Sequence, residues 1–153
     1  MSPTRLELRR LQEWLRGRQV VRARNSVGSC ILIDLGAKVG GRERLGMMPA
    51  LMIELAEWEL ARGGSGVARS RSWVPIIGSA LRKLVGTRVV GARIGPQGIT
   101  LALSKGFDLT VTSLRPGQVG PGWRLDQWVL FVGDGSAIVQ SAQGPTAWAT
   151  TGD

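Results

Sequence analysis

The sequence of 153 residues contains no histidine and no tyrosine, and it has a single cysteine. Because histidine is missing, the chain cannot build a Ser-His-Asp or Cys-His catalytic site, a histidine-ligated zinc site or a histidine pH switch. One cysteine cannot close a disulfide within the chain, and cysteine-based zinc or iron–sulfur sites need several cysteines. We therefore expect the protein to hold neither a metal ion nor a cofactor.

Long hydrophobic runs are missing as well. No apolar stretch reaches the ~18 residues that predict a transmembrane helix. Residues 1–18 also lack the apolar core of about 7–15 residues that marks a secretory signal. Cys30 lies in the apolar run 30–33, which suits a buried, reduced thiol. We expect a cytoplasmic protein without a membrane partner.

The glycine-rich stretches do not form nucleotide-binding motifs. In residues 36–41 the lysine precedes the last glycines, and no Ser or Thr follows it as a Walker A loop requires. Residues 133–135 lead into a β-rich segment, whereas a dinucleotide fingerprint leads into a helix. Asp108 and Asp126 have apolar neighbours, as catalytic carboxylates often do, but pairing with one of the many arginines is the simpler role. We expect no enzyme and no catalytic residue, although a pair of carboxylates would reveal itself only in space.

Two parts of the sequence resemble each other. Residues 15–24 match residues 84–93 at an offset of 69. Two later blocks recur at an offset of 70, which pairs residues 28–36 with 98–106 and residues 58–65 with 128–135. We predict a single compact domain, residues 1–153, built of two similar lobes at about 8–73 and 78–148. The alternative is that short strands between glycines simply look alike.

Each lobe is predicted to be α+β, with an N-terminal helix followed by a small, mainly antiparallel sheet. The first helix begins at a capping box in residues 4–7, carries an apolar stripe and ends at Gly17. The second helix covers residues 80–85, between a Ser79 cap and Gly86. Extended segments are predicted at 18–24, 30–35, 51 onward, 88–93, 99–103 and 107–113, with hairpins 58–62/67–71 and 126–132/137–141 and a loop at 115–121.

The six tryptophans divide into two groups. Trp14 lies on the apolar stripe of the first helix, and Trp58 and Trp128 take equivalent positions in the two lobes, so all three are expected in the core. The other three lie at the ends of predicted elements, where they can be exposed: Trp73, Trp123 and Trp148.

The charge is strongly basic, with 20 Lys and Arg against 11 Asp and Glu. Arginines are concentrated in residues 1–24, where a helix and the following strand can present them on one surface. The planar guanidinium binds a carboxylate or a phosphate through two parallel hydrogen bonds. The candidate binding residues are Arg9, Arg16, Arg18, Arg22, Arg24, Arg88 and Arg93. The alternative is an ordinary solvated surface.

Together these observations predict a non-catalytic binding protein that engages a macromolecular partner through an Arg-rich face. We expect the partner to be an acidic protein surface. The alternative is a nucleic acid held by its phosphate backbone, because the same arginines would suit both partners. The oligomeric state stays open.

Overall fold

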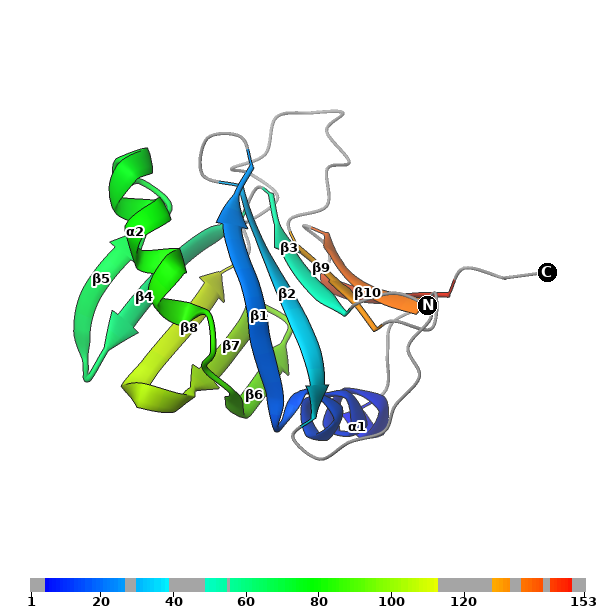
Figure 1. The fold of residues 1–153 in the computed structure, drawn as a ribbon. Coiled ribbons are helices and arrows are strands. Elements are labelled where there is room, and N and C mark those ends of the chain that lie inside the picture. Colours follow the sequence, from blue (N-terminus) through cyan, green and yellow to red (C-terminus); the bar gives the residue numbers. More distant parts are fainter. Residues whose placement is uncertain are drawn as a thin grey trace, which may run out of the picture.

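The computed structural model describes residues 5–26, 30–38, 49–54, 56–112, 128–132, 136–141 and 144–149. In these ranges the chain forms two antiparallel β-sheets and two α-helices (Figure 1). The predicted α+β class is therefore confirmed.

The two sheets hold all the strands of the described residues. The helices are α1 (Arg5–Leu15) and α2 (Val74–Leu84), and a short 3-10 helix covers Ser104–Gly106. The six-stranded sheet has the order β1-β2-β3-β9-β10-β11, and the five-stranded sheet has the order β5-β4-β8-β7-β6. The strands are β1 (Arg18–Asn25), β2 (Ile31–Lys38), β3 (Ala50–Ile53), β4 (Glu57–Arg62), β5 (Ser65–Arg69), β6 (Val89–Gly95), β7 (Gly98–Leu103), β8 (Phe107–Thr112), β9 (Trp128–Phe131), β10 (Ser136–Ser141) and β11 (Gly144–Ala149).

Helix α1 forms where the sequence predicts it. Its apolar stripe faces the core, with Leu15 fully buried and Leu8, Leu11 and Trp14 partly buried. The helix ends before Gly17, whose φ of 89° is a left-handed conformation that glycine adopts without strain.

Helix α2 begins six residues earlier than the predicted segment 80–85, and it ends at Leu84, so Val85 follows the helix with extended backbone. Trp73 precedes it with extended backbone, and Pro75 lies in the first turn, where the missing N–H would have no helical partner. Ser79 therefore lies inside the helix and does not cap it. Gly86, with a φ of 90°, follows the helix as predicted. The buried face consists of Ile77, Ala80, Leu81 and Leu84.

Neither half of the chain has a sheet of its own. Strand β3 of the first half pairs with β9 of the second, and β4 of the first half pairs with β8 of the second. Figure 1 shows β9 between β3 and β10, and β4 between β8 and β5. The predicted plan, in which each lobe follows its helix with its own sheet, is therefore wrong. Internal similarity marks equivalent segments, but it does not say which segments pair.

Each helix also packs against strands of the other half of the chain. Helix α1 packs against β6, and helix α2 packs against β1 and β5. A single hydrophobic core contains buried side chains from both sheets and both helices. Trp58 in β4 and Trp128 in β9 are both buried there, as predicted, whereas Trp14 is only partly buried.

Most strand bounds lie within a few residues of the predicted ones. The extended segment expected from residue 51 is β3, which ends at Ile53. The β4–β5 turn consists of Gly63 and Gly64, both with positive φ, so β5 begins earlier than predicted. The predicted 126–132/137–141 hairpin contains β9 and β10, which pair antiparallel. Strand β11 was not predicted, and the loop at 115–121 lies outside the described residues.

Candidate functional site

Arg18, one of the seven predicted binding arginines, is buried with an exposed fraction of 0%. Its Nε donates a 3.0 Å hydrogen bond to the carbonyl oxygen of Trp14, and its Nη1 donates a 3.4 Å bond to that of Gly36. The guanidinium carbon lies 3.7 Å from the centroid of the Trp14 ring. Arg18 therefore cannot meet a partner at the surface, and its prediction as a binding residue is wrong.

The pairing of β1 with β2 explains the error. The prediction assumed strict alternation, which would put Arg18, Arg22 and Arg24 on one face. The register instead shifts on both sides of Val20. Such an irregularity changes which face the following side chains occupy. Arg18 and Val20 consequently face the core, while Arg22 and Arg24 face solvent.

Arg22 forms an ion pair on the exposed side of β1. Its Nε lies 2.8 Å from Oδ2 of Asp34, the residue directly opposite on β2. The Arg22 side chain is 60% exposed, whereas that of Asp34 is 9% exposed. Asp34 is thus a nearly buried carboxylate whose charge is balanced by Arg22. Arg24 is exposed opposite Leu32.

Arg9 and Arg16 lie together where α1 packs against β6. Arg16 Nε donates a 3.0 Å hydrogen bond to the carbonyl oxygen of Val90. The backbone N–H of Ile94 donates a 2.7 Å bond to Gln12 Oε1. These two bonds fix the helix on the strand and set the positions of both arginines. A hollow of about 280 Å³ is lined there by Arg9, Gln12, Glu13, Arg16, Gly91 and Ala92.

Arg88 directly precedes β6, and Arg93 lies in β6 but lines a different hollow from that of Arg9 and Arg16. Arg88 is exposed and forms an antiparallel bridge with Gln19, and its N–H donates a 2.9 Å bond to Ser104 Oγ. Arg93 is exposed and lines a hollow of about 310 Å³ that includes Thr100. We refer to four residues as the α1–β6 arginines: Arg9, Arg16, Arg88 and Arg93.

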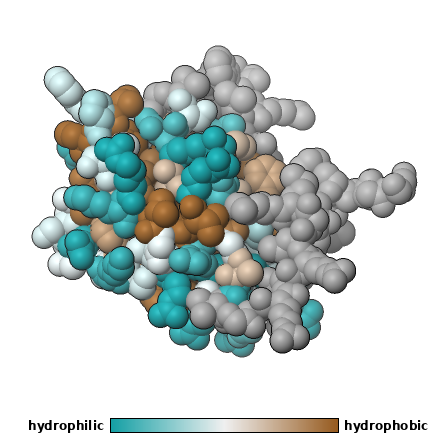
Figure 2. Space-filling model, viewed as in Figure 1, coloured by the Kyte–Doolittle hydropathy of each residue, from teal (hydrophilic) through white to brown (hydrophobic). Residues whose placement is uncertain are grey.

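Exposed valines accompany these cations. Val90, which accepts the hydrogen bond from Arg16, is exposed, and so are Val21 in β1 and Val85 at the end of α2. The Gln19–Arg88 bridge brings β1 and β6 together. Figure 2 shows hydrophobic surface among hydrophilic side chains on the face where the end of α2 meets β1. The surface therefore offers apolar contact as well as positive charge.

No family model, curated protein or solved structure matches this chain. In the ranges that the structure describes, neither helix is both long and apolar enough to span a membrane. The same ranges contain no group of three or more His, Cys, Asp or Glu side chains that could hold a metal ion.

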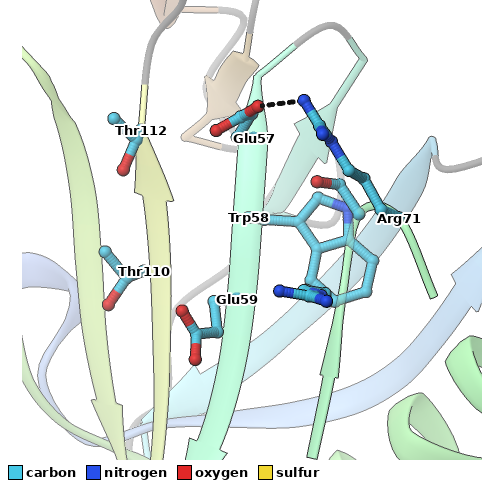
Figure 3. Close-up of a pocket in the computed structure, with 8 residues that line it drawn as sticks. Glu57, Trp58, Glu59, Arg71, Thr110 and Thr112 are labelled. Carbon is cyan, nitrogen blue, oxygen red and sulfur yellow. Dashed lines mark hydrogen bonds and ion pairs between the residues drawn. The ribbon is translucent and has the colours of Figure 1, made fainter. Parts of the chain in front are cut away.

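A further cleft, of about 380 Å³, lies on the outer face of the five-stranded sheet and was not predicted from the sequence. Glu57 Oε1 lies 3.3 Å from Arg71 Nη2. Figure 3 shows Glu57 turned toward Arg71, with Glu59 on the same strand and Thr110 and Thr112 on the neighbouring strand β8. The cleft is lined by Glu57, Trp58, Glu59, Arg69, Ser70, Arg71, Thr110 and Thr112.

The exposed strand faces that line this cleft could be predicted from the sequence. Glu57 and Glu59 alternate with buried Trp58, and Thr110 and Thr112 alternate with buried Val111. Period-two alternation of this kind marks an exposed strand face. The cleft also requires β4 to pair with β8, which is distant in the sequence, and the alternation does not predict which strands pair. Asp108 is exposed on the same strand, and Asp126 lies outside the described residues.

Cys30 is half-buried, so it is less enclosed than predicted. Its Sγ lies 3.4 Å from the carbonyl oxygen of Glu54. Burial and, to a lesser extent, the negative charge of Glu54 raise the pKa of the Cys30 thiol. The raised pKa lowers the thiolate fraction at neutral pH, which makes Cys30 a poor nucleophile.

Proposed function

We propose that this protein is a non-catalytic binding protein that engages an acidic protein surface through the α1–β6 arginines. The observation that carries the proposal is the bond from Arg16 Nε to the carbonyl oxygen of exposed Val90. It holds the Arg16 guanidinium against the backbone of a residue whose apolar side chain is exposed. Partners that present carboxylates beside apolar groups complement such a surface, because arginine anchors and apolar contacts together dominate protein interfaces.

A nucleic acid is the alternative partner. The net charge of +9 favours it, because each phosphate contact releases counterions and so contributes affinity. The exposed valines favour the protein partner, since phosphates gain nothing from them. Arg22 supports neither partner strongly because Asp34 already balances its charge.

The first experiment measures binding of two labelled probes, an acidic peptide with leucines placed among glutamates and a mixed-sequence DNA duplex. We expect the peptide to bind more tightly than the duplex. Arg9→Gln combined with Arg16→Gln should weaken peptide binding about tenfold or more. The matched control is Arg82→Gln with Lys83→Gln, which removes the same charge from exposed positions on α2 and should change affinity less than about twofold.

The variant Val90→Thr distinguishes the protein partner from the nucleic-acid partner. It keeps the charge and the approximate shape, so it should weaken binding of the leucine-containing peptide and leave DNA binding unchanged. Tighter binding to the duplex, with log K falling by about 0.9 per phosphate contact against log salt, would instead support the nucleic-acid alternative. Absence of binding to either probe at ~50 mM salt would refute both.

We also infer that the two halves are copies of one unit whose C-terminal hairpins have exchanged sheets. One sheet contains β1-β2-β3 followed by β9-β10, and the other contains β6-β7-β8 followed by β4-β5. Counted from β1 in one sheet and from β6 in the other, the two sheets have the same plan: three consecutive strands of one half are followed by a hairpin of the other half. Each unit then consists of a helix, three strands and a hairpin that pairs with the third strand of the other unit.

Hydrogen bonds at the centre of the molecule support this inference. Gly17 N–H donates a 2.7 Å bond to the carbonyl oxygen of Val89, and Gly86 N–H donates a 2.8 Å bond to that of Val20. These donors and acceptors correspond at the offset of 69 found in the sequence. The register also shifts after Val20 in β1 and after Val89 in β6. A pseudo-twofold axis near the bridge between β1 and β6 accounts for all of these features.

A further inference from the structure

Trp73 is the most exposed large hydrophobic side chain among the described residues, at 77%. Val74 and Ile76, in the first turn of α2, are exposed as well. Trp73 keeps an extended backbone before the helix, with φ of −59° and ψ of 141°, so its side chain is separated from the buried face that starts at Ile77. We call these three exposed residues, Trp73, Val74 and Ile76, the α2 tip.

The turn that carries Trp73 is fixed by its own hydrogen bonds. The Ser72 N–H donates a 2.9 Å bond to the carbonyl oxygen of Arg69, and the Arg69 N–H donates a 3.0 Å bond to Ser72 Oγ. The Ser70 N–H donates a 2.9 Å bond to the carbonyl oxygen of Trp58. An apolar anchor on a fixed turn loses little conformational freedom when it binds.

The cleft lined by Glu57, Glu59 and Arg71 ends at the same turn. Arg69 and Arg71 line the cleft, and the chain reaches Trp73 two residues after Arg71. The Arg71 side chain is 82% exposed, and its partner Glu57 is 54% exposed. Exposed ion pairs contribute little stability, so a carboxylate from outside can compete for Arg71 at small cost.

We propose that the α2 tip and this cleft together bind an extended segment of another protein that carries an acidic side chain near a large apolar one. The apolar side chain packs on Trp73 and Ile76, and the acidic one meets Arg71. Glu57 and Glu59 in the same cleft oppose a nucleic acid or an anionic lipid surface, whose phosphates are closely spaced. A polypeptide can keep its acidic group on the arginine side and offer N–H donors to the carboxylates. Arg9, Arg16 and Arg88 do not line this surface, whereas Arg93 lies beside it, in a hollow that shares Thr110 and Thr112 with the cleft.

The test is a selection from a phage-displayed random peptide library on the full-length protein, with Trp73→Ser as the counter-selection. We expect enriched peptides to carry Asp or Glu within a few residues of Leu, Ile, Phe or Trp. A synthetic peptide of the enriched sequence should lose about tenfold or more in affinity with Trp73→Ser and several-fold with Arg71→Gln. Arg82→Gln with Lys83→Gln, at the opposite end of α2, is the control, and the affinity of this variant should stay within about twofold of the wild type.

Because Trp73 is exposed, Trp73→Ser should keep the wild-type urea midpoint, and Ile76→Ser gives a second probe of the same tip. The proposal is overturned if no sequence is enriched over the counter-selection, or if the enriched peptides bind the Trp73→Ser variant equally well. It is also overturned if Trp73 is required instead for binding to phosphatidylglycerol-containing vesicles. Self-association in sedimentation that disappears with Trp73→Ser would assign the tip to a second copy and refute the proposal.

Discussion

Arg18 has a structural role at the end of helix α1. The carbonyl of Trp14 belongs to the last turn, where carbonyls have no helical donor, and Arg18 Nε supplies one. A positive charge is also favourable at the C-terminal end of a helix. The stacking on the Trp14 ring adds a cation–π contact that the surrounding burial strengthens. The side chain thereby satisfies a buried polar group and fills core volume.

We predict that Arg18→Gln lowers the free energy of unfolding by on the order of 2–4 kcal/mol, because it leaves a buried carbonyl without its donor and removes packing. Arg24→Gln is the matched control, since it removes the same charge from an exposed position on the same strand. It should change the free energy of unfolding by no more than about 0.5 kcal/mol. Urea unfolding followed by circular dichroism measures both. Equal losses for the two variants would contradict the structural role of Arg18.

At the scale of single elements, the β6–β7 hairpin depends on one glycine. Gly98 begins β7, directly opposite Gly95 on one side and Thr112 on the other. Its φ is 149°, and a Cβ atom there would overlap the carbonyl oxygen of Val111. A side chain at Gly98 must therefore force β7 away from β8.

We predict that Gly98→Ala lowers the free energy of unfolding by at least about 2 kcal/mol, because it combines backbone strain with a steric clash. Gly95→Ala is the control, because a Cβ atom at Gly95 meets nothing within 4 Å. It should change stability by less than about 1 kcal/mol. Thermal or urea unfolding of the two variants side by side checks this. A harmless Gly98→Ala would mean that β7 and β8 do not approach each other as described.

The elements themselves were largely predictable because their signals are local. The spacing of Leu8, Leu11 and Leu15 and the glycine after it defined α1. The start of α2 was missed because Ser79 looks like a cap, although the proline and apolar residues before it already continue the helix. The shift at Val20 was not predictable, because a register irregularity depends on how β2 pairs with β1. This irregularity around Val20 explains why Arg18 is buried while Arg22 and Arg24 are exposed.

At the scale of the whole molecule, what could not be predicted is which strands meet. The sequence marks Trp58 and Trp128 as equivalent, but it does not show that each lies in the sheet begun by the other half. The polar cleft has the same origin, because it forms where β4 of the first half meets β8 of the second. Contacts between distant segments depend on how the whole core packs, so local sequence patterns do not predict them.

We predict that fragments 1–72 and 73–153 do not fold separately but regain structure when mixed. Each sheet needs strands from both fragments, and short chains of this size bury too little surface to compensate. Circular dichroism and cooperative urea unfolding of each fragment and of the equimolar mixture measure this. Cooperative unfolding of either fragment alone would contradict the description of the two sheets.

The pairing of β3 with β9 has a consequence for the order of events during synthesis. Ile53 lies opposite Trp128, 75 residues later in the chain. This edge of β3 therefore stays unpaired during synthesis until residues 128–131 have left the ribosome. Such distant pairings slow folding, and open strand edges invite association with other nascent chains. Nascent chains of this protein should consequently depend on molecular chaperones until β9 emerges.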